Sequence, residues 1–215
     1  MEKEDAVILG AGAFPRHPIP LRHLRGADKV VCCDGAAREY IERERRIPWR
    51  IVGDGDSIDE DTKRRYHGIL RLFDEQENND QTKSTLYLMR HGVRNIAYVG
   101  MTGRREDHTI GNVALLVDYM RMRLSVRMYT DEGVFFPVHD TLTKEMLPEE
   151  VRESQTISLF SFGATGMKSN GLMYPLHELN SWWQGTLNKV VSADFSVTAK
   201  GDFLVYMPYL QQGAR

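Results

Sequence analysis

The chain has 215 residues, of which 41% are hydrophobic and 27% charged, as in an ordinary globular protein of one large or two small domains. Its formal net charge of -2 excludes a general attraction to nucleic acid or to an anionic membrane. No apolar run approaches the roughly 20 residues that span a bilayer, and the acidic start at residues 1–5 does not resemble a secretory signal. We therefore expect a cytoplasmic protein.

Short apolar runs, each bounded by glycine or charged residues, predict buried parallel strands in the first 130 residues. These runs cover residues 6–9, 29–33, 50–52, 96–99 and 125–129. The second run holds the only two cysteines, Cys32 and Cys33, which we interpret as small buried residues because their spacing fits no disulfide framework.

Helical patterns lie between these predicted strands. They cover residues 36–45, residues 82–91 with Gly92 after them, and an apolar stripe over residues 110–120. Ser57 and Glu60 match a capping box, which predicts a further helix that begins at Ser57. Strands that alternate with helices predict an α/β sheet with both faces covered.

The pattern changes after about residue 131. Strand-like segments at 135–136, 156–162, 189–192 and 203–206 are separated by turns, and no strong helical stripe appears. We predict a parallel-sheet α/β domain over residues 1–130 and a smaller antiparallel β domain over residues 131–215.

The segment Asp54-Gly55-Asp56 stands where the third apolar run ends. Residues one apart on an extended strand point to opposite faces, but a glycine between them lets the backbone turn until both carboxylates converge. Two converging carboxylates repel each other unless a cation lies between them, and Mg²⁺ is the usual one, often with substrate phosphates completing its shell. The segment therefore predicts a metal and phosphate site.

Other aspartates also follow predicted strands or precede helices. Asp34 follows the second strand, Asp80 opens a helix, and Asp107 precedes another. Ligands of open α/β sheets bind beyond the carboxyl ends of the strands, where Asp34 would join Asp54 and Asp56. Any one of these could be an ordinary turn or cap residue, but the set favours a functional site.

The loop from Gly100 to His108 is a second candidate. A glycine-containing loop between a strand and a helix can direct backbone N–H groups, here including those of Thr102 and Gly103, toward a phosphate. Arg105 could neutralise charge that develops during phosphoryl transfer, although a solvated basic loop is the alternative. Asn112 could face the same site or the surface, and Lys83 could reach a phosphate, although lysines in a first helical turn are more often solvated.

These segments, in this order, resemble the motifs of the thiamine pyrophosphokinase family. Asp34-Gly-Ala-Ala37 resembles DGGAN, Gly53-Asp-Gly-Asp-Ser-Ile58 resembles GDxDSI, and Glu75-Gln-Glu-Asn-Asn-Asp80 resembles DQDxTD. The segment from Gly100 to Asn112 resembles GxTGGRxDHxxxN. Two segments of the predicted β domain, 165–168 and 191–195, resemble TGLKW and VSNEF.

The resemblance implies an α/β catalytic domain followed by an antiparallel β-sandwich, in a homodimer whose active site lies between the domains of different subunits. It implies transfer of a pyrophosphoryl group from ATP to the thiamine hydroxyl, which gives thiamine diphosphate and AMP.

The resemblance also assigns roles to residues. Asp34, Asp54, Asp56 and Asp80 would form the catalytic acidic set, and the last three would hold magnesium. Arg105 would contact ATP together with Thr102, Gly103, Lys83 and Asn112. Gln76 and Asp107 would contact thiamine, and Ser192 would come from the partner subunit. Either Asp56 or Asp80 could accept the hydroxyl proton, and Asp107 could bind the aminopyrimidine.

The chain departs from the motifs at several positions. Asn79 replaces a threonine, and Arg104 replaces the second glycine of the loop, so we expect that loop to be reshaped. Ser169 replaces an aromatic residue that stacks on thiamine in some members, and Ala193 replaces an asparagine. Trp182 or Trp183 could supply the stacking surface or could be plain core residues.

Two other functions fit parts of the pattern. A phosphatase with a DxD nucleophile would need its first aspartate directly after an apolar strand, and Gly53 intervenes here. A non-catalytic thiamine- or nucleotide-binding protein would be consistent with the departures at Ser169 and Ala193.

Overall fold

The computed structural model describes residues 4–210, which form two compact units. Residues 4–115 and 123–131 form one, called here the N-terminal unit. Residues 116–122 and 132–210 form the C-terminal unit. Each unit is described by itself.

The N-terminal unit is built on a parallel sheet in the order β4-β3-β2-β1-β5-β6. Its strands are β1 (Ala6–Leu9), β2 (Val30–Cys33), β3 (Arg50–Gly53), β4 (Leu70–Leu72), β5 (Asn95–Val99) and β6 (Ser125–Tyr129). In the register, Ile8 of β1 lies between Val31 of β2 and Tyr98 of β5. The chain first builds outward from β1 to β4 and then returns to place β5 on the other side of β1. The order therefore reverses between β1 and β5, where open α/β sheets bind their ligands.

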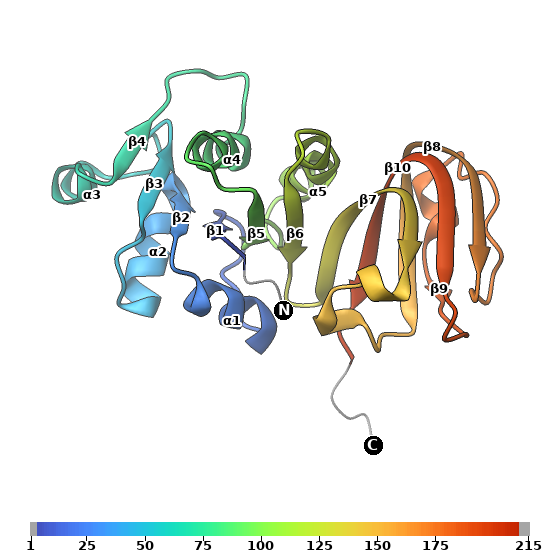
Figure 1. The fold of residues 1–215 in the computed structure, drawn as a ribbon. Coiled ribbons are helices and arrows are strands. Elements are labelled where there is room, and N and C mark those ends of the chain that lie inside the picture. The colour runs from blue at the N-terminus through green and yellow to red at the C-terminus, as the bar shows by residue number, and fades with distance from the viewer. Residues whose placement is uncertain (1–3, 211–215) are drawn as a thin grey trace. The chain divides into compact units, whose positions relative to one another are not determined.

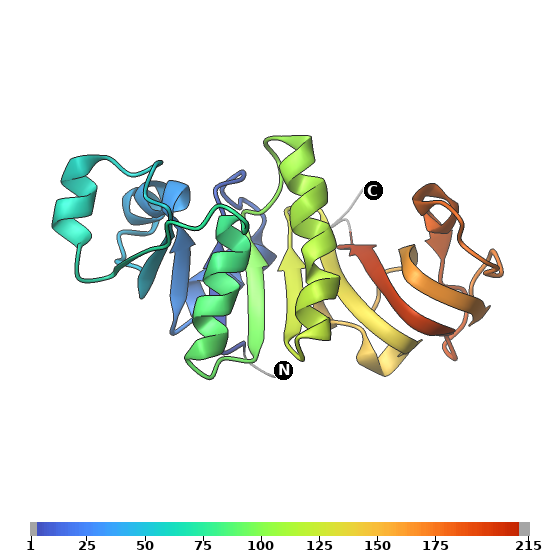
Figure 2. The same cartoon turned by 90° about the horizontal axis from the view of Figure 1, so that it is seen from above.

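Helices cover both faces of this sheet. They are α1 (Pro18–Gly26), α2 (Asp34–Glu44), α3 (Glu60–Tyr66), α4 (Asp80–Arg90) and α5 (Glu106–Arg121), the last of which ends in the C-terminal unit. Figures 1 and 2 show α1 and α2 on one face, and α4 with the first part of α5 on the opposite face. No helix within residues 4–210 has the length and apolar character needed to cross a membrane.

The predicted strands and helices of this part of the chain are confirmed, with two omissions and one wrong cap. The sequence pattern missed β4 and α1, both of which are short. Ser57 does not begin α3, because the carboxylate of Asp59 accepts the Thr62 N–H at 2.8 Å and the helix starts at Glu60. A turn in which Ile58 N–H bonds Gly55 O separates Ser57 from the helix.

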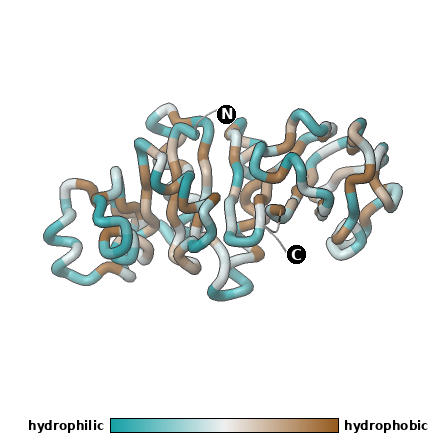
Figure 3. The backbone as a smooth tube through the Cα atoms, turned by 90° about the horizontal axis from the view of Figure 1, so that it is seen from below, coloured by the Kyte–Doolittle hydropathy of each residue, from teal (hydrophilic) through white to brown (hydrophobic). Residues whose placement is uncertain are grey.

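The core of the N-terminal unit is formed by the central strands. All four residues of β1 are at most 1% exposed. Figure 3 shows how hydrophobic stretches of the backbone, in brown, alternate with hydrophilic ones, in teal. Cys32 and Cys33 are free thiols at 0% and 3% exposure, which confirms that they are small buried strand residues.

The C-terminal unit is an antiparallel sheet in the order β7-β10-β8-β9, which confirms the predicted class of this part of the chain. Its strands are β7 (Gly133–Thr143), β8 (Thr156–Asn170), β9 (Asn188–Lys189) and β10 (Ser196–Pro208), with short 3₁₀ turns at Lys144–Met146, Glu149–Val151 and Trp182–Gly185. The register of β10 shifts against both neighbours near residues 198–203, as β-bulges do where long strands bend.

One polar cluster joins α5 to this sheet. The carboxylate of Asp202 accepts a hydrogen bond from Arg121 Nε at 2.7 Å and contacts His139 Nδ1 at 2.7 Å. Burial opposes ionisation of Asp202, but the hydrogen bonds from His139 and Arg121 outweigh it and lower the pKa of the carboxyl. The end of α5 is thereby fixed to β7 and β10.

Candidate active site

A cavity of about 600 Å³ lies in the N-terminal unit at the carboxyl ends of the parallel strands. Its lining comes from the last residue of β2, from the segments that follow β1, β3, β4 and β5, and from the first turns of α4 and α5. This is the edge of the sheet at which the strand order reverses, so topology alone favours it as the ligand site.

The cavity gathers seven of the residues that the sequence predicts for the site. They are Asp54, Gln76, Asp80, Lys83, Thr102, Arg105 and Asn112. Carboxylates and cationic side chains thus line the same cavity.

Four other predicted residues of this unit do not line the cavity. Asp34 lies behind the wall at 3% exposure, and Gly103 forms the turn before Arg104. The side chains of Asp56 and Asp107 are exposed. Within residues 4–210, no group of three or more His, Cys, Asp or Glu side chains is arranged so as to hold a metal ion. Ser192 belongs to the C-terminal unit.

Asp34 is the fixed point of the acidic set. Its carboxylate accepts the N–H of Gly35 at 2.7 Å and that of Gly55 at 3.0 Å, so it bridges the start of α2 to the turn after β3. Gly53 allows this approach, because a Cβ there would lie 2.7 Å from Asp34 Cγ. The positive φ of Gly55, 84°, gives the turn that the sequence predicts between Asp54 and Asp56.

Asp80 is strongly affected by its carboxylate neighbours. Burial raises its pKa, and the charge and hydrogen bond of Asp34 and the charge of Asp54 raise it further, to about 7, against the opposing charge of Lys83. The acidic set therefore holds a proton near neutral pH when no cation is present.

Lys83 is buried, so the alternative of a solvated lysine is wrong. Its side chain is 2% exposed, and its Nζ lies 3.9 Å from Asp54 Oδ2. Burial of an ammonium group is costly unless negative charge lies nearby. The carboxylates of Asp54 and Asp80 provide that charge in this wall.

Arg105 and Asp107 contact each other. Arg105 donates from Nε to Asp107 Oδ1 at 3.1 Å and from Nη2 to Asp107 Oδ2 at 2.5 Å. This pairing, with the N–H of His108, lowers the pKa of Asp107 to about 2. The two residues predicted to contact different substrates are thus paired with each other.

A network of amides joins α4 to α5. Asn79 caps α4 by accepting the Thr82 N–H at 2.9 Å, and its Nδ2 donates to Asn112 Oδ1 at 3.0 Å. Asn112 lines the cavity, and its Nδ2 donates to Met101 O. Gln81 donates to Asn112 O, while its buried Oε1 has no hydrogen-bond partner within the described chain. The asparagine at position 79 therefore does the capping work that a threonine would do.

Sequence reasoning missed the first loop of the cavity, residues 10–12. The N–H of Gly12 bonds Gly100 O and that of Ala13 bonds Thr102 O, both at 2.7 Å. A Cβ on Gly12 would lie 2.4 Å from Thr102 O, so only glycine fits. The run of Gly10 and Gly12 after a strand was the available signal, but it lacks the third glycine of a dinucleotide fingerprint.

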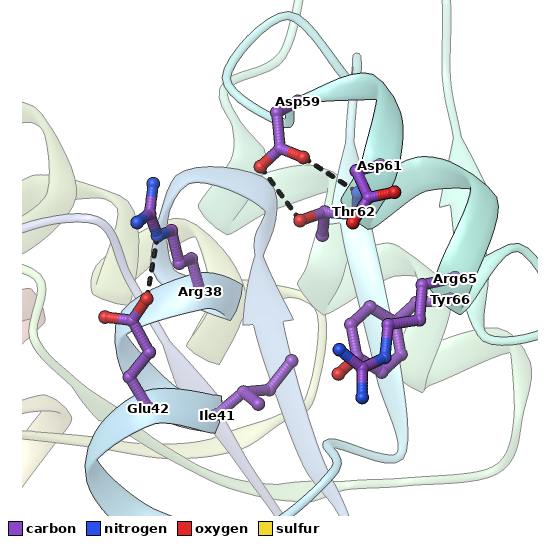
Figure 4. Close-up of a pocket in the computed structure, with 8 residues that line it drawn as sticks. All are labelled: Arg38, Ile41, Glu42, Asp59, Asp61, Thr62, Arg65 and Tyr66. Carbon is purple, nitrogen blue, oxygen red and sulfur yellow. Dashed lines mark hydrogen bonds and ion pairs between the residues drawn. The ribbon is translucent and has the colours of Figure 1, made fainter.

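A second cavity, of about 350 Å³, lies between α2 and α3. Figure 4 shows that its charged groups pair locally: Arg38 with Glu42, and Asp59 with Thr62. Arg65 lies over the ring of Tyr66. Because these groups satisfy one another, this cavity does not present a converging set of side chains to a ligand.

The residues predicted to stack on thiamine lie in the C-terminal unit. Trp182 and Trp183 are 47% and 73% exposed, so a plain core role is wrong for both. The ring of Trp182 packs against Phe162 at 5.4 Å between centroids.

Two positions of this unit that depart from the family motifs are also placed. The hydroxyl of Ser169 accepts the Leu176 N–H, and Ala193 is exposed in a turn.

The chain combines a parallel α/β unit with an antiparallel β unit. Family models agree: thiamin pyrophosphokinase, catalytic domain, matches residues 21–128, and thiamin pyrophosphokinase, substrate-binding domain, matches residues 133–206. The chain belongs to the thiamin pyrophosphokinase family.

Solved structures share the fold. The yeast thiamin pyrophosphokinase has a TM-score of 0.75 at 17% identity, over 98% of this chain and 88% of that chain. The enzyme of Geobacillus thermodenitrificans has a TM-score of 0.72 at 21% identity, over 98% and 99%. That of Bacillus subtilis has a TM-score of 0.71 at 19% identity, over 96% and 100%. No curated protein sequence matches the chain.

The raised pKa of Asp80 predicts that this site costs stability at neutral pH. The folded chain holds the Asp80 proton more tightly than the unfolded chain does. The contribution of Asp80 to the free energy of unfolding is therefore most favourable below about pH 4 and is lost as the pH rises toward 7. Asp80→Asn should exceed the wild type in free energy of unfolding by on the order of 1 to 2 kcal/mol at about pH 8, after allowance for solvent screening, and by less at about pH 5. Urea unfolding in the absence of divalent cations measures the free energy of unfolding of both proteins at each pH. The exposed Asp61→Asn is the control, and a gain equal at both pH values would contradict the assignment.

The close contact of Gly53 with Asp34 predicts that a single methyl group disturbs the acidic set. Gly53→Ala would push the Asp34 carboxylate away from Gly55 N–H and should reduce the free energy of unfolding by about 1 to 3 kcal/mol. Gly68→Ala is the matched control, because a Cβ there meets nothing within 4 Å. Equal stability of the two variants in urea would show that Asp34 does not need this approach.

Proposed function

We propose that the chain is a thiamine pyrophosphokinase that transfers a pyrophosphoryl group from ATP to the hydroxyl of thiamine. The observation that carries this proposal is the cavity that Asp54, Asp80, Lys83 and Arg105 line together, in a chain of the thiamin pyrophosphokinase family. The oxygen of the thiamine hydroxyl forms a bond to the β-phosphorus of ATP. The bond from that phosphorus to the oxygen bridging the α-phosphate breaks, and AMP leaves with the bonding electrons.

Magnesium is the proposed cofactor. Although no three acidic side chains within residues 4–210 are arranged to hold a metal ion, Mg²⁺ usually takes only one or two carboxylates and completes its shell with substrate phosphates. The carboxylates are hard oxygen donors, and their mutual repulsion, expressed in the raised pKa of Asp80, is what a divalent cation relieves. Asp54 and Asp80 would hold it, with Asp56 as the third predicted ligand. When bound, Mg²⁺ neutralises phosphate charge and orients the oxygens for in-line displacement. The exposed position of Asp56 makes it the ligand most in need of a test.

The chain's own cations would hold the triphosphate. Lys83 lies in the wall beside Asp54, and Arg105 stands at the start of α5. The loop N–H groups near Thr102 and Gly103, and the Asn112 amide, complete the proposed ATP contacts. Positioning and charge stabilisation supply most of the catalysis in phosphoryl transfer.

Thiamine would be held by Gln76 and Asp107. Gln76 lines the cavity, whereas Asp107 is paired with Arg105. Binding of phosphate by Arg105 would free Asp107 to accept from the aminopyrimidine. Of the two candidate proton acceptors for the hydroxyl, Asp80 lines the cavity and Asp56 does not.

The alternative functions differ from this one in their products. Because β3 runs through Gly53, Asp54 directly follows the strand, so Gly53 does not exclude a DxD phosphatase. Membership of the family is what argues against it. A phosphatase would release phosphate without AMP, and a binding protein would release neither.

Incubation with ATP, magnesium and thiamine should yield AMP and thiamine diphosphate in equal amounts, measured by chromatography. Asp54→Asn and Lys83→Met should lower kcat/KM by at least about 100-fold, because each removes a charge that the transferring group requires. Asp61→Asn on α3 is the control. Asp56→Asn decides the third ligand, since full activity would remove Asp56 from the metal set. Mg²⁺ should also lower the pKa of Asp80 in the absence of ATP, which reports on the metal independently of turnover.

ATP consumption without AMP, or tight thiamine binding without any product, would reject the proposed reaction. The first result would point to a phosphatase and the second to a binding protein.

We further propose a cytoplasmic homodimer in which Ser192 serves the active site of the other subunit. Large apolar side chains in residues 173–191 of the C-terminal unit are exposed, as an interface between subunits requires. They are Met173, Tyr174, Trp182, Trp183, Leu187 and Val191.

Light scattering during size exclusion should give the mass of a dimer. Trp183→Glu should weaken the dimer at least about tenfold by placing a charge in the interface. Met146→Glu, an equally drastic change at a 51%-exposed residue of the same unit outside that segment, should not. A monomeric wild type at micromolar concentration would contradict the proposal.

A further inference from the structure

Arg104 is an additional cation at the edge of the cavity, and the reaction proposed above does not use it. It lines the same wall as Asp54, Lys83 and Arg105. Thiamine pyrophosphokinase motifs carry glycine at this position. The arginine is therefore a feature of this chain to be explained from its own contacts.

The guanidinium of Arg104 is only weakly engaged. Its side chain is 58% exposed, and the one ion pair that it forms within residues 4–210 is a contact of 3.4 Å from Nη2 to Glu39 Oε2. The neighbouring Arg105 differs, because its Nε and Nη2 donate hydrogen bonds to the two carboxylate oxygens of Asp107. Within the described chain, Arg104 is thus the arginine of this wall whose hydrogen-bond donors are mostly unused.

Glu39 does not depend on Arg104. Its Oε1 accepts from Arg43 Nε at 2.8 Å, one turn along α2, and Arg43 Nη2 lies at the same distance. Exposed ion pairs of long side chains contribute little to stability. Arg104 can therefore leave Glu39 without leaving an unpaired carboxylate.

The backbone at this point is held, whereas the side chain of Arg104 is exposed. Gly103 has a φ of 83° and packs against Ala13, and the N–H of Ala13 bonds Thr102 O. Arg104 follows this fixed turn and is not among the described residues with positive φ. Because Arg104 lines the cavity while it contacts Glu39, an exchange of Glu39 for a ligand in the cavity requires no rearrangement of the loop.

We infer that Arg104 binds the polyphosphate of the nucleotide substrate and exchanges Glu39 for it when the nucleotide enters. A guanidinium pairs with two phosphate oxygens at once, a geometry that its single contact to Glu39 does not provide. The inference rests on the proposed function, since it takes the cavity as a nucleotide site. Arg104 is a binding residue here, and Glu39 is the partner that competes for it.

Calorimetry with Mg-ATP, and separately with inorganic tripolyphosphate, tests the exchange in four proteins: wild type, R104Q, E39Q and the double variant. R104Q should weaken binding about tenfold, because one charge-assisted phosphate contact is lost. E39Q should strengthen it about two- to threefold by releasing the arginine. In the R104Q background, E39Q should have no effect. R104K should recover part of the affinity, since it keeps the charge without the fork.

The control is R38Q, which removes an exposed arginine of the same helix as Glu39 that pairs with Glu42 outside this wall. It should bind within twofold of the wild type. Melting temperatures of all variants should match, which excludes a structural origin of the changes.

R104Q binding within twofold of the wild type would overturn the inference. The inference would also be overturned if E39Q increased the affinity equally in the R104Q background. The gain would then come from removal of a negative charge near the phosphate and not from release of Arg104. Wild-type binding of Mg-ATP with unchanged R104Q affinity defeats the Arg104 assignment alone. Failure of the wild type to bind either phosphate would defeat the proposed function together with it.

Discussion

The site depends on the confinement of like charges around Asp34. This buried carboxylate is fixed by the N–H groups of Gly35 and Gly55, and Gly53 leaves the space that it occupies. Asp80 lies against it and Asp54 nearby, so their negative charges repel. Carboxylates stay this close only where the surrounding structure holds them, and a bound cation or proton reduces the repulsion between them.

The positive groups of the cavity follow from that negative centre. Lys83 can be buried at the first turn of α4 because Asp54 and Asp80 supply compensating charge. The two arginines stand farther out, exposed, and paired with carboxylates outside the acidic set. Charge thus changes from a buried acidic centre around Asp34 to an exposed basic rim formed by Arg104 and Arg105.

The sequence predicted the sheet well because its strands are buried on both faces and read as continuous apolar runs. β4 escaped because its residues are only partly buried, so its pattern carries little hydrophobic signal. The carboxylates could be placed at one edge by topology, but the burial of Lys83 could not, since it depends on which helix face meets Asp54. The pairing of Arg105 with Asp107 was equally hidden, because residues two apart in a loop meet only in a particular backbone conformation.

Two departures from the family motifs, Asn79 and Arg104, have separate physical explanations. Asn79 is a neutral replacement, because asparagine caps a helix as well as threonine does and here also joins α4 to Asn112. The family motif has glycine at positions 103 and 104, but the two positions make different demands on the backbone. Gly103 requires a positive φ and close contact with Ala13, whereas position 104 has neither requirement and accepts an arginine. The expected reshaping of the loop is therefore not needed: the turn is set at Gly103, and the change at 104 adds a charge on a fixed backbone.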